Sequence, residues 1–151
     1  MRAMSKQLTK RSNYRNRRGG GTLIELMLMM PVLIALSIGA GEYGYAMYIK
    51  HTLQGAAREG ARAAVVSGAD ATSVQTAVDN YMQVCGFAQS KYTRPPTISP
   101  STWTTASAGT SISVTITAQW SNIGIDILPT WLGGIPSTKN ITGVTTMRKE
   151  G

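Results

Sequence analysis

The chain has 151 residues and a formal net charge of +8, a length that suits one modest domain. Cys85 is its single cysteine and His51 its single histidine, which excludes an internal disulfide, a cysteine-cluster metal site and a multi-histidine zinc site. Beyond residue 66 the acidic residues form no paired-carboxylate motif. We therefore expect no enzyme, no catalytic residues, no metal ion and no cofactor.

Residues 1–20 carry seven basic residues and no acidic residue, whereas the rest of the chain is nearly neutral. A basic head of this kind is typical of a nucleic-acid-binding arm or of a cytoplasmic segment that fixes membrane orientation. Here it runs directly into apolar sequence. This position favours the second interpretation, in which residues 1–20 are a basic cytoplasmic leader. We therefore expect no nucleic-acid partner.

Residues 23–40 predict a membrane-spanning helix. The 18 residues extend about 27 Å as a helix, close to the thickness of a bilayer's hydrocarbon core. Backbone polar groups in lipid must be satisfied internally, which requires a helix. The basic leader keeps the N-terminus in the cytoplasm, so the C-terminal part is exported.

Three residues depart from an ordinary anchor. Pro31 lies inside the apolar run, where it removes one hydrogen bond and clashes with the carbonyl of Met27, predicting a bend. Glu25 lies near the start of the run and Glu42 follows its far end. Each glutamate either reaches headgroups or water at the interface or has a function, because carboxylates near lipid are costly.

Residues 37–40 also resemble a weak signal-peptidase site, so a secreted binding domain that begins at Gly41 is an alternative. The apolar run is longer than a usual signal peptide's, and helical sequence continues past Ala40. Both observations favour an anchor.

The helix is expected to continue to about Val66, giving a membrane and extended-helix region over residues 21–66. Small residues recur every four positions and allow a neighbouring element to approach closely: Ala56, Gly60 and Ala64, with Ala57 and Ala61. This face packs on the protein's own domain or against another subunit. Arg58 and Arg62 share a different face, with Glu59 spaced for a weak pair with Arg62.

Residues 67–151 are expected to form a small exported α+β domain. A second helix is predicted from an Asp70 cap to about Cys85, because its apolar residues share one face. Gly86 is placed to end it. Cys85 is then interpreted as a buried small hydrophobic residue, not a reactive thiol.

Residues 111–120 alternate apolar and polar side chains, which predicts a half-buried antiparallel strand. Residues 141–148 are a weaker strand candidate, and two strands need a helix to pack on. Residues 88–111 are expected to be irregular, with a short strand near Trp103, and residues 123–136 to form an apolar loop or short turn. Trp120 and Trp131 are assigned to the core, with an exposed binding patch as the alternative.

Residues 17–25 resemble the processing site of type IV pilin-like precursors. In those proteins a membrane aspartyl peptidase cuts after a glycine, and a glutamate is the fifth residue of the mature chain. Three consecutive glycines leave the cut open among Gly19–Gly21, but a cut between Gly20 and Gly21 makes Glu25 the fifth residue.

From Glu25 onward the chain resembles the TadE/TadF family of the tight-adherence (Tad, type IVc) pilus system. The matching strings are residues 41–44, 48–53, 56–62 and, at the end, 145–148; Leu26 departs from the aromatic residue of many relatives. The resemblance implies a minor pilin or pseudopilin of the bacterial inner membrane, trimmed by a prepilin peptidase and acting in pilus assembly and adhesion.

Its partners would be inner-membrane lipid, other pilins or pseudopilins, the peptidase and the Tad assembly platform. In pilin-like assemblies the fifth-residue glutamate is thought to pair with a neighbour's N-terminal amine, which is the role expected of Glu25. An uncleaved single-pass anchor protein is a further alternative. The residues expected to act in packing and assembly are Glu25, Glu42, Ala56, Arg58, Glu59, Gly60, Ala61 and Arg62.

Overall fold

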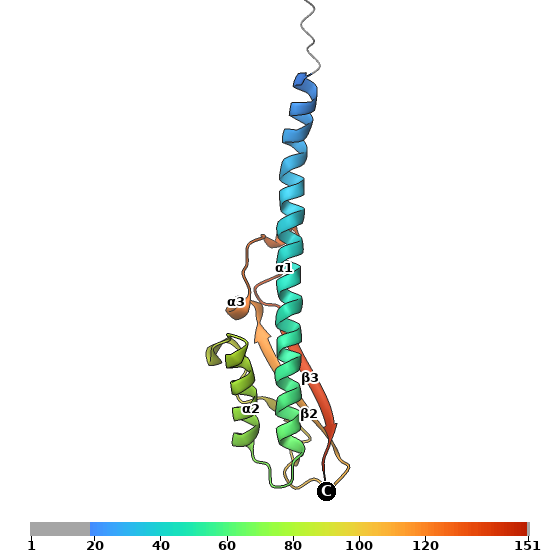
Figure 1. Cartoon of the computed structure of the whole chain (residues 1–151), viewed down its shortest axis with the longest axis vertical. Helices are drawn as coiled ribbons and strands as arrows, with labels where there is room; N and C mark the ends of the chain where they lie inside the picture. Colours follow the sequence, from blue (N-terminus) through green and yellow to red (C-terminus); the bar gives the residue numbers. More distant parts are fainter. Residues whose placement is uncertain (1–18, 151) are drawn as a thin grey trace, which may run out of the picture. The chain divides into compact units, whose positions relative to one another are not determined.

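The computed structural model of the chain describes residues 19–150, with side chains from residue 21 onward. Two principal helices and a three-stranded antiparallel sheet confirm the predicted α+β class (Figure 1). The chain divides into two compact units, one ending at Ile34 and the other beginning at Ala35. The predicted division at residues 20 and 66 separates a leader, a membrane and extended-helix region and an exported domain. It refers to the position of the membrane and stays a prediction.

Helix α1 spans Gly19–Val65 and ends one residue before the predicted position. The helix continues through Pro31 without a break. In the first unit, all side chains of residues 21–34 are exposed. In the second unit, one side of α1 is buried from Ile49 onward, and this side carries the packing of the domain.

Helix α2 spans Ala71–Val84 and begins at the predicted cap. The Asp70 carboxylate accepts a hydrogen bond from the Ser73 amide at 2.7 Å, and the Asp70 amide donates to Ser73 Oγ, which completes a capping box. The hydrogen bond from the Ser73 amide lowers the pKa of Asp70. At the other end Gly86 adopts a left-handed φ of 83°, a conformation that favours glycine. Cys85 is half-buried as the C-cap.

The sheet has the order β1-β2-β3, with β2 (Ser111–Gln119) pairing antiparallel with β1 (Thr97–Ser99) and β3 (Asn140–Arg148). The alternation predicted for β2 is confirmed, because the side chains that face the helices are buried: Ile112, Val114, Ile116 and Ala118. Residues 141–148 form the predicted second strand, which begins one residue earlier.

Two boundaries differ from the prediction. The short strand lies at residues 97–99, between two prolines, and not near Trp103; the Trp103 amide instead donates to the Pro100 carbonyl in a turn. β2 stops at Gln119, and Trp120 begins the short helix α3 (Trp120–Ile123). Two 3₁₀ turns complete the fold, η1 (Gln89–Lys91) and η2 (Thr130–Leu132).

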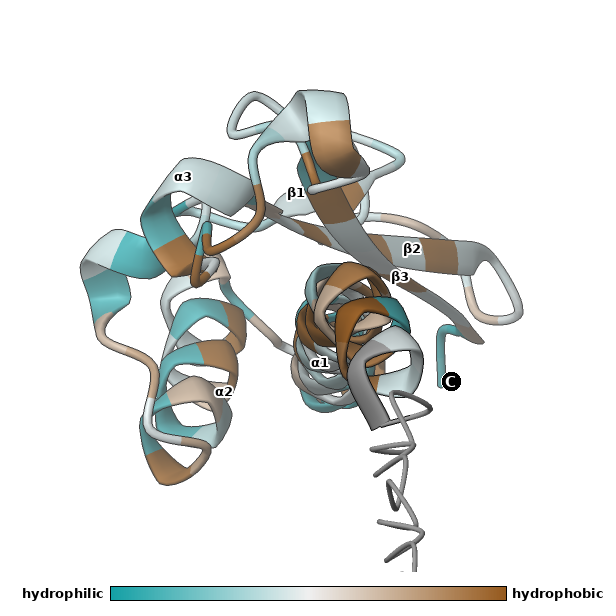
Figure 2. Cartoon of the chain, turned by 90° about the horizontal axis from the view of Figure 1, so that it is seen from above, coloured by the Kyte–Doolittle hydropathy of each residue, from teal (hydrophilic) through white to brown (hydrophobic). Residues whose placement is uncertain are grey.

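The core forms where α2 lies beside the second part of α1 and the sheet covers another side of that helix (Figure 2). Gly60 permits this close approach: a Cβ there would lie 2.8 Å from Val78 Cγ2 on α2 and 3.2 Å from Val114 Cγ1 on β2. On β3, a Cβ at Gly143 would overlap the backbone of Leu53. Glycine at these two positions therefore lets the helix lie close to its neighbours, and a larger residue at either position would clash.

Candidate membrane anchor and assembly site

The first residues of α1 present a continuous apolar surface. Ten large hydrophobic side chains are each more than half exposed between residues 21 and 34: Leu23, Ile24, Leu26, Met27, Leu28, Met29, Met30, Val32, Leu33 and Ile34. Among the described residues, α1 is the one helix that is long and apolar enough to cross a membrane. A surface of this size marks a membrane or protein contact, and its length and composition suit a membrane.

The predicted processing residues lie at the start of this surface. α1 begins at Gly19, so the Gly20–Gly21 bond lies in its first turn. Gly21 and Glu25 are exposed, and nothing in the described structure lies within 4 Å of a Cβ built on Gly21. Most of the predicted leader, residues 1–18, lies outside the described residues.

Glu42 is 2% exposed, so the interpretation that it reaches headgroups or water is wrong. Its Oε2 accepts a hydrogen bond from the Leu128 amide at 3.2 Å, and its Oε1 accepts one from the Ile135 amide at 3.1 Å. A buried carboxylate is tolerated when its oxygens are hydrogen-bonded. Glu42 therefore acts inside its own domain, where it holds the loop after α3 against α1.

That loop, residues 124–136, matches the prediction of an apolar connection and contains one 3₁₀ turn, η2. In Figure 1 it reaches α1 above α3 and the strands β2 and β3. Leu128 turns inward and is 7% exposed, whereas Trp131 is 82% exposed. Assigning both tryptophans to the core is thus right for Trp120, which is fully buried, and wrong for Trp131.

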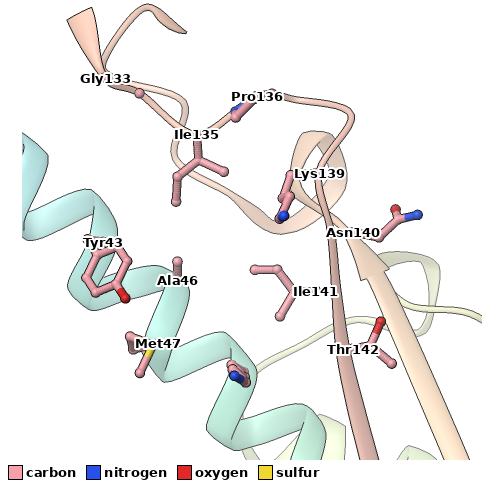
Figure 3. Close-up of a pocket in the computed structure, with 12 residues that line it drawn as sticks. Tyr43, Ala46, Met47, Gly133, Ile135, Pro136, Lys139, Asn140, Ile141 and Thr142 are labelled. Carbon is pink, nitrogen blue, oxygen red and sulfur yellow. The ribbon is translucent and has the colours of Figure 1, made fainter.

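A groove of about 620 Å³ lies next to this loop (Figure 3). α1 provides one wall with Tyr43, Ala46 and Met47, and the segment 133–142 provides the other. Lys50 and Lys139 are among its lining residues. The groove is mostly apolar, and no sequence pattern indicates it because its two walls are distant along the chain.

The small-residue face of α1 packs within the chain. Its members are fully or almost fully buried by α2 and the sheet: Ala56, Ala57, Gly60, Ala61 and Ala64. Arg58 and Arg62 are exposed and Glu59 is half-buried. The weak Glu59–Arg62 pair is not formed, since the one ion pair among the described residues joins Arg94 to Asp79.

Sequence reasoning missed the polar cluster around Asp79. Its carboxylate accepts hydrogen bonds of 2.6 Å from Gln75 Nε2, the Tyr92 hydroxyl and an Arg94 nitrogen. Burial opposes ionisation, but these three bonds outweigh it, so the pKa of Asp79 lies below its ordinary value. Burial and the bond to Asp79 raise the pKa of Tyr92. The i, i+4 spacing of Gln75 and Asp79 was the one available signal.

Fold and site together define a class: a small α+β domain built on a helix whose first part is apolar, exposed and long enough to serve as a single membrane anchor. Residues 20–62 match the model of the TadE-like protein family, which confirms the predicted resemblance over these residues. The matched segment runs from the predicted processing site to Arg62 and includes both Glu25 and Glu42, whereas residues 145–148 lie outside it. No curated protein and no solved structure matches the chain.

Proposed function

We propose that the chain is a minor pilin or pseudopilin of a Tad (type IVc) pilus. It is inserted once in the bacterial inner membrane, with its N-terminus in the cytoplasm and residues 67–151 in the periplasm. The observation that carries the proposal is the TadE-like match over the exposed apolar start of α1. The basic leader supports the orientation, because positive residues stay on the cytoplasmic side.

Processing between Gly20 and Gly21 would release the leader and create a new α-amino group at Gly21. Glu25 is exposed, and its side chain makes no hydrogen bond or ion pair with other described residues. Its carboxylate is therefore free to pair with the N-terminal amine of a neighbouring subunit. In a poorly solvated layer, such a pair gains far more than it would in water.

The same logic separates Glu25 from Glu42, the other glutamate of the apolar region. Glu42 already uses both carboxylate oxygens within its own domain. Intersubunit pairing is thus assigned to Glu25, and Glu42 supports the fold of the subunit that is assembled.

The decisive experiment is mass spectrometry of the N-terminal peptide, in cells with and without the prepilin peptidase. We expect Gly21 as the first residue with the peptidase and an intact leader without it. A mature chain that begins at Gly41 would instead support a secreted domain. An intact leader in both strains would support an uncleaved anchor.

The assembly role is tested with Glu25→Ala, measuring membrane extraction and the amount of pilus material sheared from cells. We expect normal membrane insertion and loss of assembled material. Glu150→Ala is the control, because it removes an exposed carboxylate outside α1 and should assemble normally. Full assembly by the Glu25 variant would show that the pairing role is wrong.

A further inference from the structure

The loop after α3 carries an exposed apolar cluster that the proposed function does not use. Four of its hydrophobic side chains are 45–82% exposed: Ile125, Ile127, Trp131 and Leu132. Exposed branched aliphatic residues beside a tryptophan mark a contact surface. We propose that this loop embeds these side chains in the headgroup layer of the membrane that α1 enters, on the exported side. The inference rests on the proposed membrane insertion of α1.

The level of the loop along α1 is set by Glu42. Its two hydrogen bonds hold the backbone at Leu128 and Ile135 beside residue 42. The predicted span ends at Ala40, two residues or about 3 Å earlier along the helix. The headgroup layer on each side of a bilayer is about 5–8 Å thick. The loop backbone is therefore fixed at the depth of that layer.

From Leu128 to Ile135 the loop pairs most of its backbone amides within the chain. The amides of Leu132 and Gly134 donate to the Pro129 carbonyl, and the Gly133 amide donates to the Thr130 carbonyl. Pro129 and Pro136 have no amide hydrogen, and Glu42 satisfies two further amides. Irregular backbone near lipid needs its polar groups paired in this way, and the headgroup layer can hydrate the amides of the loop that remain.

The side chains fit an interface better than the hydrocarbon core. Trp131 combines a large apolar ring with an N–H group, and tryptophan is enriched at membrane–water interfaces for this reason. Asp126 is exposed and is the one charged residue of the loop, so it must remain among headgroups or water. A shallow position satisfies both residues.

Lipid is favoured over a protein partner because the cluster continues a membrane-facing surface. Leu36 and Tyr43, which lie in the same compact unit as the loop, are 72% and 64% exposed on α1. They bracket the end of the predicted span and Glu42. The loop thus adds apolar area at the level where the helix leaves the hydrocarbon.

The test uses the full chain reconstituted in phosphatidylcholine vesicles, with tryptophan fluorescence as the readout. Trp103 and Trp120 are buried, so quenching by brominated lipid should come mainly from Trp131. We expect strong quenching by lipids brominated near the headgroup and weak quenching by aqueous acrylamide. Trp131→Phe should remove most of the lipid quenching, whereas the matched Trp103→Phe should keep it.

Glu42→Ala should lower lipid quenching of Trp131 because the loop loses its attachment, and Glu42→Gln should have a smaller effect. Alkaline carbonate extraction reports α1 insertion separately. If the chain inserts but its Trp131 is quenched by acrylamide and not by lipid, the inference is overturned and the proposed membrane anchor stands. Shielding from both quenchers indicates a covering second copy and also overturns it. Failure of insertion overturns both proposals.

Discussion

The two parts of α1 differ in what their side chains contact, although both belong to one helix. Residues 21–34 expose large hydrophobic side chains, whereas residues 49–65 bury one side beneath α2 and the sheet, and much of that side is alanine and glycine. The first part depends on an external apolar phase, and the second depends on close packing within the chain. Large residues are therefore tolerated throughout the first part but not at the alanine and glycine positions of the second.

The largest effect is expected from a substitution that disturbs membrane insertion of the first part alone. Leu28→Arg places a charge among exposed apolar side chains, which opposes insertion by about 3 kcal/mol. We expect most of the chain to become extractable by alkaline carbonate. Leu28→Ile is the control and should remain in the membrane. Unchanged insertion of the arginine variant would contradict the assignment of this surface to lipid.

The next largest effect is expected from a substitution that disturbs the packing of the second part. Gly143→Ala would force a methyl group into the Leu53 backbone, and overpacking of this kind costs about 3 kcal/mol. Urea unfolding of the detergent-solubilised chain should show a lower free energy of unfolding. Gly44→Ala is the control, since its added methyl group meets no atom and alanine favours helix by about 1 kcal/mol. Equal stability of the two variants would contradict the packing described.

A smaller effect on the free energy of unfolding is expected when the two glutamates are replaced in turn. Glu42→Ala leaves the amides of Leu128 and Ile135 without their acceptor, which should cost about 2 kcal/mol of unfolding free energy. Glu25→Ala should leave the same quantity unchanged, because Glu25 is exposed. Thermal unfolding of both variants in detergent measures the difference. Similar behaviour of the two would show that Glu42 does not hold the loop.

The smallest effect concerns pH. Asp79→Asn weakens the bonds from Tyr92 and Arg94 and should cost about 1 kcal/mol at pH 7. Because the folded-state pKa of Asp79 lies below the unfolded value of about 3.9, its contribution is present above about pH 4 and is lost as pH falls through the folded pKa.

Urea unfolding at pH 7 and pH 3 should therefore show a gap in the free energy of unfolding between wild type and the Asp79→Asn variant. This gap should be smaller at pH 3. Asp126→Asn is the control, because Asp126 is exposed and should leave the pH profile unchanged. A gap that stays constant between the two pH values would mean that ionisation of Asp79 does not support the fold.

Features with a local periodic signal were predictable. The apolar spacing after Asp70 located α2, and the alternation from Ser111 located β2, because each pattern is repeated over several residues. The TadE-like segment was also recognisable from short strings along α1. Boundaries were less certain, since β1 depends on pairing with β2 and not on its own three residues.

The role of Glu42 was not predictable. Its partners are backbone amides 86 and 93 residues away, and an amide carries no side-chain signature in a sequence. Trp131 was misassigned for a related reason: residues 124–136 have no period that tells an inward side chain from an outward one. The Asp79 cluster likewise joins α2 to residues 13 and 15 positions later, across the η1 turn.

The partners of Glu42 also constrain the order in which the domain is completed. A chain made from its N-terminus presents Glu42 long before Leu128 and Ile135 exist, and Leu53 long before Gly143. Until the segment from Leu128 to Gly143 has been synthesised, Glu42 lacks its hydrogen-bond donors and Leu53 has no strand packed against its backbone. The domain therefore stays incomplete for most of synthesis and closes only when its last strand is made.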